Sequence, residues 1–362
     1  MALSNIPPSH HLSSNEEVRR YAKSTKEGIY PLSESEVEWR DRYAFLERNG
    51  LQLQPRYHLE WRPSWLETGE SAGYCEDSAE SWVRYTMDAT QLGEPFEMLS
   101  IKSVKRKWPE FAIASQLSNF ATDPSNHCVP IQMLLDDPLY PHKVLMVTPY
   151  LRPFNEPELS LVHDVMDFVK QTLEGLRFLH DHNIAYRDCN SRSIMMDARS
   201  LYPQGHHPIN INSARNGFDK ALHYGRLHHP VKYYFADLSK ARQFQPDRKP
   251  YVVYKGGQDK RLPEWSSKLP YDAFKADVYH LGSLFERAFL RADEDLQCPD
   301  LHEFLEFFKF LVTAMTYHEP KERSTASYAL FMAEKITSLI PEEHMSMNLW
   351  KTPTLRSLRR TG

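Results

Sequence analysis

The 362-residue sequence predicts an α+β chain in two parts, a small β-rich part that ends near residue 151 and a larger helical part after it. Two observations support this fold class. Before residue 151 the apolar residues fall in short runs bounded by turn residues, which is typical of strands. After it they recur at the i, i+3, i+4 and i+7 spacing of amphipathic helices. The chain is also longer than one compact core usually needs.

The composition is that of an ordinary globular protein and limits the possible functions. Hydrophobic residues make up 41% and charged residues 25% of the chain, and the net charge of −4 gives no reason to expect nucleic acid as a partner. The four cysteines form no Cys-x-x-Cys pair, which favours an intracellular protein of the cytoplasm, with the nucleus left open. No apolar run reaches the ~18 residues of a membrane span, and the start lacks a secretory pattern, so no membrane association is expected.

The first 65 residues predict a leader followed by an extension. Residues 1–32 show no periodicity and are expected to be disordered. Ser33 and Glu36 have the spacing of a capping box, so a helix is expected to begin there and to end at Gly50. Prolines and aromatic residues then favour an extended segment as far as residue 65. We expect residues 33–65 to pack on the domain that follows.

Residues 66–151 predict a small sheet with one helix. A loop comes first, then two strands joined by a turn, one helix and two more strands. The two strands are expected over 82–89 and 96–104, the helix over 110–120, and the further strands over 129–135 and 143–151.

Residues 152–340 predict the helical part, and an irregular stretch interrupts it. The stretch, about 198–230, lacks periodicity and is interpreted as a solvated insertion, since its two His-His pairs fit no zinc spacing. The polar tail, 341–362, is expected to be disordered. Helices are expected over 165–179, 277–290, 304–315 and 325–340.

The most specific patterns lie in the helical part. One is Tyr186-Arg187-Asp188-Cys189-Asn190-Ser191-Arg192-Ser193, between a predicted helix and the strand-like Ile194-Met195-Met196-Asp197. The others are Asp237 after a strand-like run, Leu262-Pro263-Glu264, Asp277-Val278-Tyr279-His280-Leu281-Gly282, and Arg323. In this order they resemble the catalytic loop, the metal-binding aspartate, the end of the activation segment and the central helix of a eukaryotic protein kinase. The resemblance implies a bilobal protein-kinase-like fold with a β-rich N-lobe and a helical C-lobe.

The resemblance implies catalytic roles for four residues. Asp188, preceded by Arg187, would orient the substrate hydroxyl or accept its proton. Asp237 would hold Mg²⁺. Lys102 would bind the ATP phosphates and pair with Glu110 on the next helix. By themselves this lysine and glutamate would be interpreted as surface charges, and it is the downstream motifs that favour the catalytic roles.

The resemblance also implies residues for adenine and for architecture. In the strand over 143–151, Thr148 would lie at the back of the nucleotide pocket and Leu151 would offer its N–H to adenine, and a plain buried strand is the alternative. Glu264 and Arg323 would form a buried ion pair. Asp277 would hold the backbone of the catalytic loop, and Arg187 would also have a structural role in that loop. These structural residues separate protein kinases from aminoglycoside phosphotransferases.

A narrower resemblance is to uncharacterised kinase-like proteins of mushroom-forming fungi. It extends over residues 36–340 and includes the distinctive string Asn126-His127-Cys128-Val129-Pro130, together with Val231-Lys232-Tyr233-Tyr234-Phe235. This likeness implies the kinase fold and a fungal origin. It does not supply a substrate.

The chain departs from the kinase pattern at several positions. Tyr186 stands where the histidine of the catalytic loop is expected, and Ser239 stands where a glycine follows the metal-binding aspartate. Ser193 replaces the asparagine that would hold a second Mg²⁺, and a serine hydroxyl is a weaker ligand for a hard cation. Gly69 and Gly73 are a poor substitute for a glycine-rich phosphate loop.

Three classes of function therefore stay open. The first is a Ser/Thr-type protein kinase, of normal or weakened activity, that uses ATP and Mg²⁺ on a protein substrate. The second is a pseudokinase that binds ATP or a protein partner as an interaction module. The third, least favoured because of the Glu264 and Arg323 motif, is a small-molecule phosphotransferase. The retained Asp188 favours catalysis, because an interaction module has no physical need for it.

Overall fold

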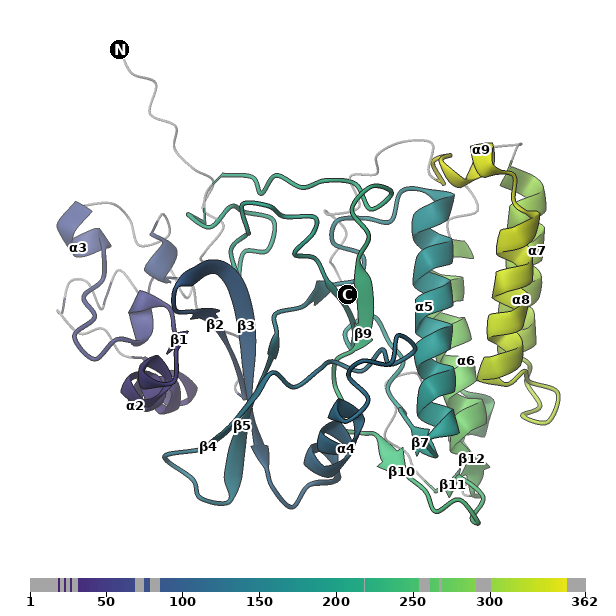
Figure 1. The fold of residues 1–362 in the computed structure, drawn as a ribbon, viewed down its shortest axis with the longest axis horizontal. Coiled ribbons are helices and arrows are strands. Elements are labelled where there is room, and N and C mark those ends of the chain that lie inside the picture. Colours follow the sequence, from purple (N-terminus) through teal and green to yellow (C-terminus); the bar gives the residue numbers. More distant parts are fainter. Residues whose placement is uncertain are drawn as a thin grey trace. The chain divides into compact units, whose positions relative to one another are not determined.

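The computed structural model describes residues 32–68, 75–78, 85–217, 219–253, 261–266, 269–290 and 301–349, with three isolated positions before residue 32. The described chain is α+β, as predicted (Figure 1). It divides into two compact units. Unit 1 comprises the residues up to Phe111, 131–151 and 198–225, and unit 2 comprises 112–130, 152–197 and the residues from Arg226 onward. None of the described helices is both long enough and apolar enough to cross a membrane.

Unit 1 is built on a five-stranded antiparallel sheet with the order β1-β2-β3-β5-β4. The longest strand, β3, is central and presents Lys102 opposite Thr86 on β2 and Met146 on β5. Gly93 has a φ of +88° in the turn between β2 and β3, a conformation that favours glycine. The strands are β1 (Leu51–Gln52), β2 (Thr86–Gln91), β3 (Glu94–Lys105), β4 (Met133–Asp136) and β5 (Lys143–Pro149).

The two faces of this sheet differ, because side chains alternate along each strand. One face carries Met87, Ala89, Leu99, Ile101, Leu145 and Val147, which pack with Trp39, Tyr43 and Leu46 of α2 (Glu34–Arg48) in one hydrophobic cluster. The residues that alternate with these point to the opposite face. They include Asp88 of β2 and Lys102 of β3. The face that carries Lys102 also carries the buried Met98, Val104, Val144 and Met146, so apolar side chains are packed on both faces of the sheet.

The N-terminal extension follows the sequence prediction at its start and differs further on. The backbone N–H of Ser33 donates to the Glu36 carboxylate at 2.8 Å, and Gly50 follows the helix with a φ of +81°. The segment expected to be extended instead contains a short helical turn, because the buried Arg56 gathers it around the Glu36 carboxylate at 2.6 Å. The turn inside this segment is η1 (Pro55–Tyr57), and two more short helical turns, α3 (Trp65–Thr68) and η3 (Glu76–Ser78), lie at its end and in the loop expected after it.

Unit 2 contains the helices predicted after residue 151. Figure 1 shows α5 beside α8, and these two helices pack on each other. The boundary between the two units falls within α4, so α4 contributes residues to both. The helices are α4 (Pro109–Ser118), α5 (Val162–Asp181), α6 (Ala273–Phe285) with a π-helical turn (Glu286–Leu290), α7 (His302–Met315), α8 (Ala326–Leu339) and α9 (Glu342–Met345).

Short strands in unit 2 fix the loops between the helices. A three-stranded sheet has the order β6-β8-β9, and β8 and β9 each adjoin one of the predicted motif loops. The strands are β6 (Arg152–Pro153), β7 (Ile184–Ala185), β8 (Ile194–Asp197), β9 (Lys232–Phe235), β10 (Arg242–Gln243), β11 (Tyr251–Val252) and β12 (Tyr271–Asp272), with β7 paired to β10 and β11 to β12.

The C-terminal tail corrects the prediction of disorder over its first residues. Leu349 is buried, and its N–H donates to the Ser160 carbonyl at 2.9 Å. The Val162 N–H donates to the Met347 carbonyl at 3.1 Å, so the tail continues the hydrogen bonding before α5. Burial of one leucine side chain is the physical reason that this polar segment is ordered. Residues beyond 349 and nearly all of the expected leader lie outside the described residues.

The stretch expected to be a solvated insertion of the helical part is also corrected. The described residues of this stretch, 198–217 and 219–225, are ordered, and the stretch belongs to unit 1. The Tyr150 hydroxyl donates to the Pro208 carbonyl at 2.6 Å, and Arg199 pairs with Glu97. His207 is fully buried and its Nδ1 accepts the Asn210 N–H at 2.8 Å. Tertiary partners thus order this stretch, which has no periodic pattern of its own.

Candidate functional site

The predicted pairing of Lys102 with Glu110 is confirmed within unit 1. The Lys102 ammonium donates to the Glu110 Oε1 atom. The Glu110 side chain is 4% exposed and the Lys102 side chain 28% exposed. A buried carboxylate needs such a partner, so the pair fixes the lysine on the sheet face opposite the hydrophobic cluster.

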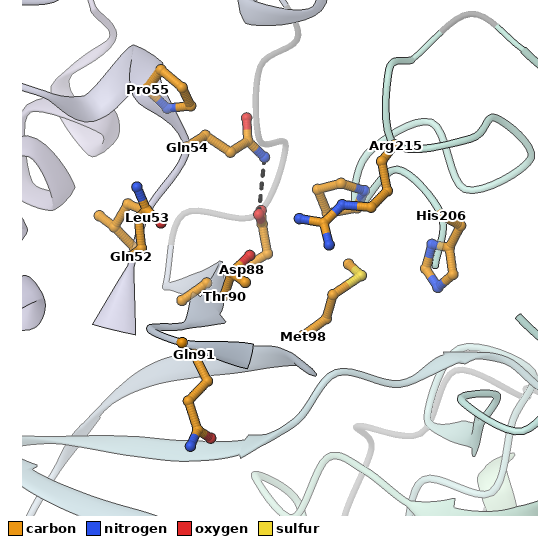
Figure 2. Close-up of a pocket in the computed structure, with 13 residues that line it drawn as sticks. Gln52, Leu53, Gln54, Pro55, Asp88, Thr90, Gln91, Met98, His206 and Arg215 are labelled. Atoms are coloured by element: carbon orange, nitrogen blue, oxygen red, sulfur yellow. Dashed lines mark hydrogen bonds between the residues drawn. The ribbon is translucent and has the colours of Figure 1, made fainter. Parts of the chain in front are cut away.

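A cavity of about 340 Å³ opens on the same face of the sheet, and all its lining residues belong to unit 1. Asp88 on β2 accepts a hydrogen bond from Gln54 Nε2 at 2.9 Å (Figure 2). Figure 2 also shows Arg215, from the stretch 198–225, reaching toward Asp88 and Met98. A carboxylate, a guanidinium and apolar walls suit a small polar ligand. No pattern in the sequence indicated that the stretch 198–225 would line a cavity.

The residues predicted to bind adenine lie at the end of β5 in unit 1. Thr148 is opposite Ser100 of β3, and its hydroxyl has two long contacts, 3.5 Å to the Ser100 carbonyl and 3.4 Å to the Pro149 carbonyl. The Tyr150 N–H donates to the Met98 carbonyl at 3.0 Å. Leu151 is buried at the end of this segment. Whether Thr148 and Leu151 meet a nucleotide stays a prediction.

In unit 2, Asp277 holds the loop that carries Asp188. Its carboxylate accepts the N–H groups of Tyr186 at 2.8 Å and Arg187 at 2.6 Å. Arg187 has a φ of +66°, which is costly for a residue with a side chain and persists only when its surroundings enforce it. The fully buried Asp277 supplies that constraint. Asp277 therefore has the predicted structural role.

Tyr186 links this loop to the segment that carries Asp237. Its hydroxyl donates to the Ser193 carbonyl at 2.9 Å and accepts the Asp237 N–H at 3.4 Å. The ring is fully buried, and burial raises the pKa of the phenol well above its ordinary value. Tyr186 thus stays neutral and hydrogen-bonded. The tyrosine that stands in place of the expected histidine therefore has a structural role.

Ser193, which was predicted to be a metal ligand, has its hydroxyl bonded within its own loop, and the metal role stays a prediction. The side chain is buried, and the hydroxyl donates to the Asp188 carbonyl while it accepts the Asn190 N–H at 3.2 Å. A serine hydroxyl has one proton to donate, and here that proton bonds a backbone carbonyl of the same loop. The residue thus fixes the backbone of Asp188.

Ser193→Ala is therefore expected to act on stability and not on metal affinity. It leaves a buried carbonyl and a partly buried N–H without this partner, so the free energy of unfolding should fall by ~1–3 kcal/mol. Urea unfolding gives that value, and a Mg²⁺ titration of the nucleotide-bound protein gives the metal affinity. A Ser193→Ala variant that is as stable as wild type, but whose nucleotide complex binds Mg²⁺ tenfold more weakly, would show that the Ser193 hydroxyl is a metal ligand.

Asp188 forms an ion pair that the sequence did not predict. Lys240 Nζ donates to Asp188 Oδ1 at 2.8 Å, and the Asp188 side chain is only 6% exposed. Arg187 Nη1 in turn donates to the Lys240 carbonyl at 3.2 Å. Lys240 is therefore bonded to both residues of the loop, to Asp188 through its ammonium and to Arg187 through its carbonyl. No motif marks a lysine at this position, so sequence reasoning had no means to find it.

Asp237 follows β9, and its Oδ1 accepts the Ser239 N–H at 3.0 Å. A partly exposed carboxylate of this kind suits Mg²⁺, which prefers oxygen ligands and keeps several waters. Within the described ranges no group of three or more histidine, cysteine, aspartate or glutamate side chains is arranged to hold a metal ion. The chain thus offers one acidic ligand here and no closed metal cage in its described part.

The predicted Glu264–Arg323 ion pair is confirmed in unit 2. Arg323 donates from Nη1 to Glu264 Oε1 at 3.0 Å and from Nη2 to Oε2 at 3.1 Å. It also donates to the carbonyls of Tyr317, Lys275 and His318, and its side chain is fully buried. The guanidinium therefore ties the segment around Glu264 to three backbone positions.

The distinctive string from Asn126 to Pro130 holds the strand that leads to Asp237. The Phe235 N–H donates to the His127 carbonyl at 2.7 Å, and His127 Nδ1 contacts the Tyr233 carbonyl at 2.8 Å. Gly175 of α5 leaves room for this packing, since a Cβ there would lie 2.5 Å from the His127 Cβ. The string is thus a structural feature of unit 2.

Cys189, next to Asp188, is not suited to act as a nucleophile. Burial raises the pKa of its thiol well above the ordinary value, and the charges of Asp277 and Asp188 add to the effect. A thiol that stays protonated is a poor nucleophile. Covalent thiol chemistry is therefore not a competing explanation for this loop.

The predicted site residues thus form two groups, each within one unit. Lys102, Glu110, Thr148 and Leu151 belong to unit 1, whereas Asp188, Ser193 and Asp237 belong to unit 2, with the structural residues Arg187, Glu264, Asp277 and Arg323. No protein-family model matches this sequence, and no curated protein matches it.

Proposed function

We propose that this protein is a protein-kinase-like phosphotransferase that uses Mg²⁺ and ATP and transfers the γ-phosphoryl group to a protein serine or threonine hydroxyl. The observation that carries the proposal is the ion pair of Lys102 on the third strand with Glu110 on the next helix. Protein kinases need such a pair to hold the lysine against the phosphates. The bilobal kinase fold is part of the same proposal, and the strand order of unit 1 and the Glu264–Arg323 pair support it.

Each remaining role follows from the chemistry of one side chain. Lys102 would bind phosphate oxygens. The cavity on its sheet face, which Lys102, Thr148 and Leu151 do not line, would hold the nucleoside. Asp237 would hold Mg²⁺, which would shield the phosphate charge when bound. Asp188, fixed by Asp277 and Ser193, would orient the attacking hydroxyl and take its proton. The fixed loop backbone favours transfer because positioning supplies much of the catalysis in this reaction.

The second candidate is a pseudokinase that binds ATP or a protein partner without transfer. The position of Ser193 favours it, because the hydroxyl serves the loop and leaves Asp237 as the candidate metal ligand. Loss of one metal ligand typically costs ~10–100-fold, which weakens an enzyme without abolishing its activity. Measured transfer therefore decides between the two candidates.

Lys102→Met is expected to raise the Kd for Mg–ATP by ~10–100-fold, because it removes charged hydrogen bonds worth ~1.5–3 kcal/mol. The Kd for adenosine should stay unchanged. Met98→Trp, which would fill the cavity, should weaken ATP and adenosine alike. Isothermal titration calorimetry measures both ligands.

Lys105→Met is the matched control, since Lys105 lies on the same strand but contacts the Trp108 ring. It should leave both Kd values unchanged. ATP that binds equally well to wild type and to Lys102→Met would refute the assigned role of the lysine, and absence of any ATP binding would refute the proposed function.

A further inference from the structure

The ammonium of Lys240 lies beside the carboxylate proposed to take the substrate proton. Lys240 Nζ is 2.8 Å from Asp188 Oδ1, and the lysine side chain is 26% exposed. Among the described residues, Asp188 is the partner that this ammonium contacts. An ammonium has three N–H donors, so the ion pair leaves donors for a bound group.

The backbone of Lys240 is anchored to both loops of the proposed site. The Arg187 guanidinium donates to its carbonyl at 3.2 Å. The residues before it form a turn around Asp237, whose carboxylate accepts the Ser239 N–H, and the Ala241 N–H donates to the Leu238 carbonyl at 3.0 Å. One short turn thus carries both the candidate metal ligand and a cation. A flexible surface lysine would have neither constraint.

We infer, on the basis of the proposed function, that Lys240 is a catalytic residue that contacts the γ-phosphoryl group of ATP. In the transfer, the substrate oxygen bonds to the γ-phosphorus as the bond from that phosphorus to the bridging oxygen breaks. ADP leaves with the electron pair of that bond, and the hydroxyl proton passes to Asp188. Lys240 keeps its proton and offsets the charge on the transferred group and the carboxylate.

The competing explanation is a purely structural ion pair that occupies Asp188. Such a pair would hold the carboxylate away from a substrate, and its removal would leave transfer unchanged or increase it. The two explanations differ in whether Lys240 distinguishes nucleotides that have a γ-phosphate from those that lack it. That distinction can be measured without any turnover.

The first test compares the Kd of Mg–ATP with the Kd of Mg–ADP for wild type, Lys240→Met and Lys240→Arg. Lys240→Met should reduce the preference for ATP about tenfold, as expected for one lost charged contact. Lys240→Arg should keep most of the preference because it keeps the charge. Lys232→Met is the control, since Lys232 lies on β9 and contacts the Pro124 carbonyl and the Tyr234 ring.

The second test measures phosphate transfer from radiolabelled ATP by the same variants, after thermal unfolding has shown that each is folded. Lys240→Met should lower the rate at saturating ATP by ~10²–10³-fold, the usual loss when one fixed electrostatic donor is removed. An unchanged preference for ATP, or faster transfer by Lys240→Met, would overturn the inference while the proposed function stands. Wild type that binds neither nucleotide would overturn the proposed function itself, and the inference with it.

Discussion

Replacing Arg323 by alanine is expected to lower the free energy of unfolding by ~3–5 kcal/mol, because it leaves the Glu264 carboxylate without its bidentate partner in a mostly buried place. The carbonyls of Tyr317, Lys275 and His318 lose a donor as well. Urea unfolding followed by circular dichroism gives the value. The loss should be nearly the same with and without Mg–ATP, since the residue has an architectural role.

Arg261→Ala provides the matched control for this experiment. Arg261 pairs with Glu286 at 3.5 Å, and both side chains are about a third or more exposed. An exposed ion pair of this kind contributes ~0–1 kcal/mol. Equal losses for the two arginine variants would contradict the buried ion pair.

The second large effect is expected for catalysis. Asp188→Asn keeps the shape of the side chain but removes the carboxylate that would take the hydroxyl proton, so transfer should fall by ~10²–10⁴-fold. The Kd for Mg–ATP should change little. Phosphate transfer to a generic protein substrate and autophosphorylation at high Mg²⁺ measure the rate.

Asp181→Asn is the control for Asp188→Asn, because Asp181 is 65% exposed at the end of α5. It should transfer phosphate at the wild-type rate. If wild type and Asp188→Asn give the same signal, the measured transfer does not come from this site, and the pseudokinase function is favoured.

Two ion pairs, Lys102–Glu110 and Glu264–Arg323, could be predicted because short motifs mark them. Lys102 and Glu110 lie close together in the chain, and the contexts of Glu264 and Arg323 are specific enough to identify each partner. The partners of the Ser193 hydroxyl could not be predicted, because residue type does not reveal whether a hydroxyl faces a metal or its own loop.

Two further features lay beyond the sequence patterns for different reasons. Lys240 is one of many lysines, and only the folded loop brings it to Asp188. The stretch 198–225 lacks periodicity, so its order depends on partners far away in the chain, such as Tyr150. Tertiary contacts of this kind leave no local signal.

The division of the chain into units has a consequence for biosynthesis. Unit 1 includes residues 198–225, which the ribosome delivers only after residues 112–130 and 152–197 of unit 2. Domains generally fold as units in the order of their synthesis, but unit 1 cannot form its contacts with residues 198–225 until the intervening part of unit 2 has been made. Contacts between such distant parts of a chain form slowly. The nascent protein is therefore expected to depend on chaperones until residue 225 has left the ribosome, and a chain cut at residue 151 should not yield a stable small unit.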